Sequence, residues 1–376
     1  MEIGIDARAA RWYRGTGIGT YTYQLIYNLN LIDNKNSYLL FWPDENYSDI
    51  HPGDNFNFKL ISDDDRKDNF WEEVHIPNIL TDTKIQVYHV PQNGIGLPDE
   101  KICPYVVTIH DVIPYKLPET VGPNYLKIFL EQMPDIIKKA DGIITVSEFS
   151  KNDIAKTLNI PLNKIFVTPL AAESIYYPMD RVKAKQLLSR KYKIDFDYIL
   201  YLGGFSPRKN IKGLIESYYK IYKKLITPCK LLIVGKPGKS YDDYKQLVNK
   251  LGLDDYVVFT GYIPVNDLPL FYNGAQLFVY PSLYEGFGLP PLEAMACATP
   301  TVTSNVTSMP EIVDGCAMTI NPYDIDELAE AMHIILEDKK LWDHYSHIGF
   351  KRSMEFSWKT TAWKTLGVYY NFADTK

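Results

Sequence analysis

The sequence predicts two Rossmann-like, doubly wound α/β domains that face each other across a cleft. Three observations predict this fold class: the chain has 376 residues, short apolar runs alternate with helical patterns, and that alternation pauses once. A typical domain has about 100 to 200 residues, so this length fits two domains. Continuous apolar strands that alternate with helices are typical of parallel sheets covered on both faces.

The predicted strands are thirteen short runs rich in β-branched and aromatic residues. Seven precede the pause, at 2–6, 38–42, 58–62, 87–91, 105–110, 142–147 and 165–170, and six follow it, at 198–203, 230–235, 256–261, 277–282, 299–304 and 317–321. We therefore expect an N-terminal domain over 1–175, a linker over 176–197 and a C-terminal domain over 198–355, followed by a helical segment over 356–376. The helical period of that last segment places Trp363, Leu366 and Tyr370 on one face.

Composition excludes several classes of protein. The chain is 46% hydrophobic and 23% charged, with 40 basic and 46 acidic residues and a net charge of -6, which indicates neither disorder nor nucleic-acid binding. Four scattered cysteines lack metal-ligand spacing, which favours reduced thiols and no zinc site: Cys103, Cys229, Cys297 and Cys316. No signal peptide or run of about 18 apolar residues is present, so a cytoplasmic protein is expected.

Ligands of doubly wound sheets bind at the carboxyl ends of the strands. After the strand at 198–203, Arg208 and Lys209 stand immediately before a predicted helix, where cations and free amides suit a phosphate. The alternative is an ordinary solvated loop in which Asn210 caps the helix.

Two acids follow the strand at 277–282. Glu285 stands at the strand end, and Glu293 stands in the first turn of the next helix, where it could bond a pair of vicinal hydroxyls such as those of a ribose. The glycines between them allow backbone amides to approach a ligand. The alternative makes Glu293 a capping carboxylate and Glu285 a solvated loop charge.

The stretch Glu285-Gly286-Phe287-Gly288-Leu289-Pro290, followed by Glu293, resembles the retaining nucleotide-sugar glycosyltransferases of family 4 (glycosyl transferases group 1), which have the GT-B fold. Further blocks resemble that family in the same order and cover nearly the whole chain, at 15–26, 109–118, 145–154, 203–218, 259–304, 308–313 and 356–366. The resemblance implies an acceptor-side N-terminal domain, a C-terminal domain that binds the nucleotide sugar, and a final helix that returns to the N-terminal domain.

The resemblance also implies roles for individual residues. Lys209, with Arg208 beside it, corresponds to the lysine that stabilises the departing diphosphate, and Glu293 to the acid that binds the ribose. Glu285 corresponds to the acid that contacts the transferred sugar. Three further groups of donor-binding residues match: the backbone amides of Gly286, Phe287 and Gly288, the adjoining Leu289, and Tyr262 beside the nucleobase. Many members have an arginine where this chain has Gly204, which leaves Arg208 as the second phosphate cation.

In the N-terminal domain, Gly17 corresponds to a glycine of a loop that faces the donor phosphates and the acceptor, and His110 to a histidine that lines the reaction centre. The alternative for His110 is a strand-end histidine bonded to backbone. Asp111 is expected to orient its loop rather than to catalyse.

The resemblance implies transfer of a hexosyl group, with retention, from a UDP-, GDP- or dTDP-linked sugar to a hydroxyl of a glycan, a lipid-linked molecule or a small molecule. The nucleotide sugar is a co-substrate, so no cofactor is expected. No metal is expected either, because no Asp-x-Asp motif follows a strand, and the acidic run at 62–68 is interpreted as a solvated turn.

Other interpretations remain open at this point. An epimerase or phosphorylase could share the two-domain architecture, a noncatalytic homologue could keep it, and a periplasmic binding protein also has two such halves. The segment 181–193 has six basic residues, which fits either contact with the inner face of a membrane or a solvated interdomain helix.

Overall fold

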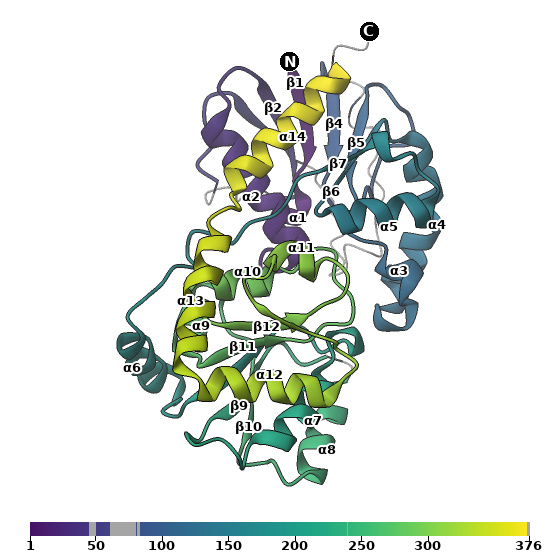
Figure 1. The fold of residues 1–376 in the computed structure, drawn as a ribbon. Coiled ribbons are helices and arrows are strands. Elements are labelled where there is room, and N and C mark those ends of the chain that lie inside the picture. The colour runs from purple at the N-terminus through teal and green to yellow at the C-terminus, as the bar shows by residue number, and fades with distance from the viewer. Residues whose placement is uncertain (45–49, 61–79, 81–82, 239, 374–376) are drawn as a thin grey trace. The chain divides into compact units, whose positions relative to one another are not determined.

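The computed structural model of the chain describes residues 1–44, 50–60, 80, 83–238 and 240–373. The chain divides into two compact units (Figure 1): residues 1–170 with 357–376 form unit 1, and residues 171–356 form unit 2. Each unit is built on one parallel sheet, with helices between many of its consecutive strands.

Unit 1 contains a seven-stranded sheet in the order β3-β2-β1-β4-β5-β6-β7. Its strands are β1 (Glu2–Asp6), β2 (Ser37–Trp42), β3 (Phe56–Leu60), β4 (Val87–Val90), β5 (Tyr105–Thr108), β6 (Gly142–Thr145) and β7 (Ile165–Val167). Its helices are α1 (Arg8–Trp12), α2 (Gly17–Ile32), α3 (Ile113–Lys116), α4 (Pro123–Lys139), α5 (Glu148–Leu158) and α14 (Trp358–Ala373), with short 3₁₀ turns η1 (Pro118–Thr120) and η2 (Leu162–Lys164).

Unit 2 contains a six-stranded sheet in the order β10-β9-β8-β11-β12-β13. Its strands are β8 (Tyr198–Leu202), β9 (Lys230–Val234), β10 (Val257–Gly261), β11 (Leu277–Tyr280), β12 (Thr301–Ser304) and β13 (Met318–Ile320). Its helices are α6 (Arg181–Tyr192), α7 (Ile211–Ile221), α8 (Tyr241–Lys250), α9 (Leu268–Gly274), α10 (Leu289–Ala296), α11 (Met309–Val313), α12 (Ile325–Glu337) and α13 (Lys339–Ser353), with η3 (Pro207–Lys209) and η4 (Val265–Asp267).

Each predicted strand overlaps an observed strand, which confirms the α/β interpretation. The central strands β4, β5, β6 and β11 are buried at every position, as expected for strands covered on both faces. Several predicted runs are too long at the carboxyl end, so that His110 and Ser282 lie in loops rather than in β5 and β11. The last two residues of the run at 58–62 and the acidic run at 62–68 lie outside the described residues.

The segment 176–197, which the sequence analysis treats as a linker, is part of unit 2. Its helix α6 packs on α9 and buries Ala184 and Leu188. Asp180 caps the helix by accepting a hydrogen bond from the Lys183 amide at 2.9 Å. An apolar contact face on a short basic helix explains why the segment docks on unit 2.

Three of the six basic residues at 181–193 are engaged within unit 2. Arg181 donates to the carbonyl of Ala275 at 2.5 Å, and its guanidinium lies 4.9 Å from the ring centroid of Trp342. Ion pairs join Lys185 to Asp197 and Lys191 to Asp267.

Helix α14 packs beside α2 in unit 1 (Figure 1). Its buried residues are Trp358, Thr361, Ala362, Thr365, Leu366, Val368 and Tyr369. The expected face is therefore wrong in two of three positions, because the side chains of Trp363 and Tyr370 are 56% and 45% exposed. Small and hydroxylated residues occupy much of the buried face, whereas two large aromatic side chains are exposed. Hydrophobic periodicity alone therefore does not identify the buried face of this helix.

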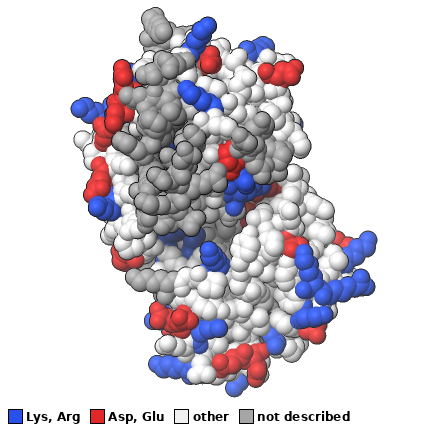
Figure 2. All heavy atoms as spheres, turned by 180° about the vertical axis from the view of Figure 1, so that it is seen from behind, with Lys and Arg blue, Asp and Glu red and all other residues white. Residues whose placement is uncertain are grey.

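No helix in the part of the chain that the structure describes is long and apolar enough to cross a membrane. Figure 2 shows basic and acidic side chains interspersed over the described part of one face of the molecule. A nucleic-acid-binding surface gathers basic residues on one face. The mixture of charges on the described part of this face differs from such a surface.

The burial of α14 predicts different effects for two of its substitutions. We expect Leu366→Ala to lower the free energy of unfolding by about 2 to 4 kcal/mol, because it removes a buried side chain. Trp363→Ala, on the exposed face, should change it by less than about 1 kcal/mol. Urea unfolding of both variants measures this, and a larger loss from Trp363→Ala would contradict the assigned face.

Candidate active site

Two loops of unit 2 meet because the strands that precede them are neighbours. β8 and β11 pair in parallel, so their carboxyl ends lie at the same edge of the sheet. The loop after β8 contains Arg208 and Lys209, and the loop after β11 contains Glu285. The Leu283 amide donates to the carbonyl of Arg208 at 2.7 Å, which ties the two loops together.

Glu285 is the centre of a buried polar cluster. Its Oε1 accepts hydrogen bonds from Lys209 Nζ at 2.5 Å, Arg208 Nη1 at 2.9 Å, Ser282 Oγ at 2.5 Å and Tyr280 Oη at 3.1 Å. Only 8% of the residue is exposed. An ionised carboxylate at this depth is stable only with such partners, because burial penalises an unpaired charge.

Opposite charge determines the ionisation of Glu285. Burial alone raises the pKa of this carboxyl, but the positive charges of Arg208 and Lys209 and the hydrogen bonds from Lys209 and Ser282 lower it to about 2. Glu285 is therefore an anion at neutral pH. The alternative of a solvated loop charge is wrong.

Arg208 and Lys209 are also largely buried, with 18% and 12% of their side chains exposed. Arg208 donates additionally to the carbonyl of Tyr284 at 2.8 Å. Asn210 caps α7 as expected, by accepting from the Gly213 amide at 3.2 Å. The alternative interpretation of this loop is therefore right about the Asn210 cap. It is wrong about the two cations, which do not lie in a solvated loop.

Gly288 is required by the backbone between β11 and α10. Its φ of 116° lies in the left-handed region, and a Cβ here would lie 2.2 Å from Met309 Cε. The single proton of Ser308 Oγ is shared between the carbonyls of Phe287 at 2.7 Å and Glu285 at 3.0 Å. The Glu285 amide donates to Thr307 Oγ1 at 3.2 Å. The segment before α11 therefore fixes the turn that presents Glu285.

Glu293 lies on α10 and accepts a hydrogen bond from Tyr272 Oη at 2.7 Å. Because α10 begins at Leu289, Glu293 is its fifth residue, so its predicted place in the first turn and the capping alternative are both wrong. Burial raises the pKa of Glu293 to about 7, and the nearby charge of Glu173 also raises it. The hydrogen bond from Tyr272 acts in the opposite direction and lowers the pKa. The two acids thus differ in their protonation near neutral pH.

The other predicted donor residues of unit 2 differ in their exposure to solvent. Gly286 and Phe287 are buried, and Leu289 is half-buried at the start of α10. The ring of Phe287 packs edge-on against Phe356 with centroids 5.9 Å apart. Tyr262 follows β10, and 66% of it is exposed.

His110 lies just beyond β5 in unit 1 and is 9% exposed. Its Nε2 bonds the carbonyl of Pro91 at 2.9 Å, so Nε2 carries the proton, and its backbone amide donates to Asn93 Oδ1 at 2.9 Å. Burial lowers the pKa of His110 to about 4, so the ring is neutral with an unprotonated Nδ1 at neutral pH. Asp111 accepts from the Ile113 amide at 2.9 Å, which is the orienting role expected for it.

A chain of buried hydrogen bonds lies beside His110. Tyr21 contacts His110 edge-on, with centroids 4.9 Å apart, and its hydroxyl bonds Thr108 Oγ1 at 2.9 Å. Thr108 bonds His89 Nε2 at 2.8 Å, and His89 Nδ1 bonds Tyr369 Oη of α14 at 2.7 Å. This chain connects the C-terminal helix to the surroundings of His110.

Gly17 is the first residue of α2. A Cβ on Gly17 would meet nothing within 4 Å, whereas one on Gly19 would lie 1.9 Å from the carbonyl oxygen of Tyr13. Thr16 caps the helix by accepting from the Gly19 amide at 3.2 Å. The fold therefore explains Gly19 but leaves open space at Gly17.

Sequence reasoning missed the residues whose hydroxyls bond the predicted carboxylates, among them Ser282, Tyr280 and Tyr272. Tyr280 and Ser282 touch Glu285, and Tyr272 touches Glu293. A hydroxyl at the end of the apolar run 277–282 was a usable signal for Tyr280, because strand ends face the ligand edge. No local signal marks Tyr272, which comes from α9.

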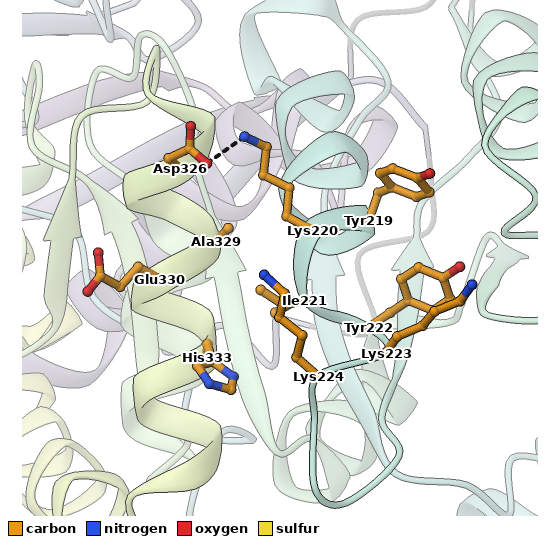
Figure 3. A pocket seen from close by; sticks show the side chains of 10 residues that line it. All are labelled: Tyr219, Lys220, Ile221, Tyr222, Lys223, Lys224, Asp326, Ala329, Glu330 and His333. Carbon is orange, nitrogen blue, oxygen red and sulfur yellow. Dashed lines mark hydrogen bonds and ion pairs between the residues drawn. The ribbon is translucent and has the colours of Figure 1, made fainter.

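Among the described residues, no group of three His, Cys, Asp or Glu side chains is arranged to hold a metal ion. A groove of about 760 Å³ lies between the end of α7 and α12, and its lining includes Lys224, Glu330 and His333 (Figure 3). Lys220 and Asp326 form an ion pair of 2.5 Å across it. None of the predicted site residues lines this groove.

Comparison with known proteins gives two matches to protein families. The family described as Glycosyltransferase Family 4 matches residues 16–172, and the family described as Glycosyl transferases group 1 matches residues 185–352. Together the two matches include every predicted site residue of both units.

Three similar proteins illustrate the likeness. O-antigen chain mannosyltransferase B of Escherichia coli is 34% identical over 77% of this chain and 75% of its own. The serotype-specific mannosyltransferase WbdA of Escherichia coli is 30% identical over 77% of this chain, which spans only 37% of that protein. Sucrose-phosphate synthase from Thermosynechococcus elongatus superposes with a TM-score of 0.77 at 21% identity, over 99% of this chain and 98% of its own. That superposition confirms the expected GT-B fold.

The raised pKa of Glu293 predicts how stability depends on pH. A carboxyl with a raised pKa favours folding below its ordinary value near 4.5, and this contribution is lost as pH rises through about 7. Glu293→Gln should therefore flatten the fall in unfolding free energy between pH 5 and 8, by up to about 1.4 kcal/mol per pH unit. Urea unfolding across that range, with the exposed Glu330→Gln as the matched control, measures it. An unchanged slope in Glu293→Gln would contradict the assignment.

Proposed function

The chain belongs to the glycosyl transferases of group 1, and on that premise we propose that it is a retaining, metal-independent mannosyltransferase. It moves a mannosyl group from a nucleoside diphosphate mannose to a hydroxyl of a glycan acceptor. Membership of the family makes it a glycosyltransferase that uses a nucleotide sugar. The mannosyl group and the glycan acceptor are supported by the O-antigen chain mannosyltransferase that is 34% identical to it.

The observation that carries the proposal is the cluster of Arg208, Lys209 and Glu285 at the carboxyl ends of β8 and β11. Departure of a nucleoside diphosphate requires stabilisation of the negative charge that develops on its phosphates. Two largely buried cations supply this, because a charge in a desolvated site interacts more strongly than the same charge in water.

Retention in this proposal follows from attack on the same face of the sugar. The bond between the anomeric carbon and the phosphate oxygen breaks, the acceptor oxygen bonds to that carbon, and the acceptor proton passes to the leaving phosphate. Glu285 is a poor covalent nucleophile, because the cations that lower its pKa to about 2 leave the carboxylate weakly basic. Its charge is better suited to stabilise positive charge on the sugar ring as the donor bond breaks.

The remaining residues are assigned to the two ends of the donor. Glu293 binds the ribose hydroxyls, Tyr262 lies beside the base, and the backbone from Gly286 to Leu289 contacts the sugar. Tyr262 is exposed and therefore accessible to a base.

Two residues of unit 1 complete the assignment. Gly17 admits the phosphates or the acceptor, which the open space at its missing Cβ supports. His110 lines the reaction centre as a neutral ring that can accept a hydrogen bond from a sugar hydroxyl at Nδ1.

Metal independence and location are part of the same proposal. Arg208 and Lys209 neutralise the diphosphate in the way that a divalent cation does in other transferases. We place the reaction in the cytoplasm, because the scattered cysteines favour a reducing compartment. We propose contact with the inner face of a membrane only for the case of a lipid-linked acceptor. Three of the six basic residues at 181–193 are engaged within unit 2, which weakens the attraction of this segment to an anionic membrane.

Transfer from GDP-, UDP- and dTDP-linked mannose and glucose to a mannose-containing oligosaccharide tests the proposal. We expect turnover with a mannosyl donor, and a product whose new anomeric proton has the configuration of the donor in NMR spectra. EDTA should leave the rate unchanged. An inverted linkage, transfer of glucose alone, or activity lost in EDTA and restored by magnesium or manganese would each overturn the corresponding part of the proposal.

The two acids should separate in binding and turnover. At pH 8, where Glu293 is mostly ionised, Glu293→Gln should weaken binding of the nucleoside diphosphate about tenfold to a hundredfold, because a hydrogen bond of a charged group to the ribose is lost. Glu285→Gln should bind it at least as tightly as the wild type, since negative charge beside Arg208 and Lys209 is removed, while turnover falls. Calorimetry and rate measurements on both variants test this division. Weak binding in Glu285→Gln, or normal binding in Glu293→Gln, contradicts it.

A further inference from the structure

Tyr280 is the last residue of β11, and its side chain touches both members of the central ion pair. We propose that Tyr280 is a positioning residue that holds the Lys209 ammonium and the Glu285 carboxylate in one fixed arrangement for transfer. The inference rests on the roles given above to Lys209 and Glu285.

The Tyr280 hydroxyl acts both as a hydrogen-bond acceptor and as a hydrogen-bond donor. It accepts a hydrogen bond from Lys209 Nζ and donates one to Glu285 Oε1 at 3.1 Å. One hydroxyl thus contacts both members of the ion pair, as an acceptor from Lys209 and as a donor to Glu285.

The position of Tyr280 is itself fixed by the sheet. The residue is 1% exposed, and its carbonyl accepts from Thr303 Oγ1 of the neighbouring strand β12 at 2.9 Å. Burial and the charge of Glu285 raise the pKa of Tyr280 well above its ordinary value, so the hydroxyl keeps its proton at neutral pH. The Lys209 side chain is flexible, and its hydrogen bond to Tyr280 ties its ammonium to a rigid strand. Less conformational entropy is therefore lost when the transition state forms.

Packing alone does not account for a tyrosine at this position, because phenylalanine has the same ring. The neighbouring Tyr201 of β8 provides the comparison. Its ring stacks on that of Tyr280 with centroids 6.1 Å apart, and it is also fully buried. Its hydroxyl, however, donates to the carbonyl of Gly204 at 2.9 Å. The two tyrosines share a packing environment and differ in what their hydroxyls bond.

The test compares Tyr280→Phe with Tyr201→Phe, which is the matched loss of a buried hydroxyl. We expect kcat of Tyr280→Phe to fall about tenfold to a hundredfold with less than a threefold change in donor KM, the range for a lost hydrogen bond to a charged group. Tyr201→Phe should stay within about threefold of the wild type. Equal kcat in Tyr280→Phe and the wild type, or an equal loss in both variants, overturns the inference.

A double-mutant cycle separates positioning from a general effect on folding. If Tyr280 acts through Lys209, Tyr280→Phe should change kcat little in a Lys209→Met background, whereas a structural role gives the same fold-change in both backgrounds. A second cycle measures the unfolding free energy of Tyr280→Phe, Glu285→Gln and the double variant by urea titration. Non-additive values are expected, and additive values overturn the inference. This second cycle needs no activity, so a wild type that transfers no sugar refutes the proposed function and leaves the Tyr280 contact to be decided by stability.

Discussion

The buried ion pair between Lys209 and Glu285 is the interaction on which the rest of the candidate site depends. Neither charge would be stable at this depth alone, because removal from water costs several kcal/mol per ion. Arg208, Ser282 and Tyr280 complete the hydrogen bonding of the carboxylate, so the charges are retained rather than neutralised. Two cations and one acid leave the cluster with a net positive charge, which under the proposed function stabilises the diphosphate of the donor.

Sheet topology makes this cluster possible. The cations follow β8 and the acid follows β11, and these two strands are neighbours although the residues are 76 positions apart. The turn after β11 is then held by Gly288, whose backbone no other residue adopts readily, and by Ser308, which bonds two of its carbonyls. The geometry of the site is thus a consequence of strand order and of one tight turn.

The surroundings of the predicted residues in each unit tune their titratable groups in three different ways. Cations hold Glu285 ionised, burial keeps Glu293 near the middle of its titration at neutral pH, and burial keeps His110 neutral. Environments that push similar groups toward different protonation states are characteristic of sites that bind and transform ligands. In unit 1 the neutral His110 is accompanied by a hydrogen-bonded chain that ends on Tyr369 of α14.

The sequence by itself determined the two α/β units and their strands, and it singled out Arg208, Lys209, Glu285 and Glu293 as candidate ligand-binding residues, because apolar runs and loop residues are local features. It could not determine what those residues touch. Only the folded structure shows that Tyr280 bonds Glu285 and that Glu293 is the fifth residue of α10, beyond its first turn. The buried face of α14 and the attachment of 176–197 to unit 2 were decided in the same way. Burial, pKa and contact across 76 residues depend on distances in space, and those are set by packing rather than by local sequence.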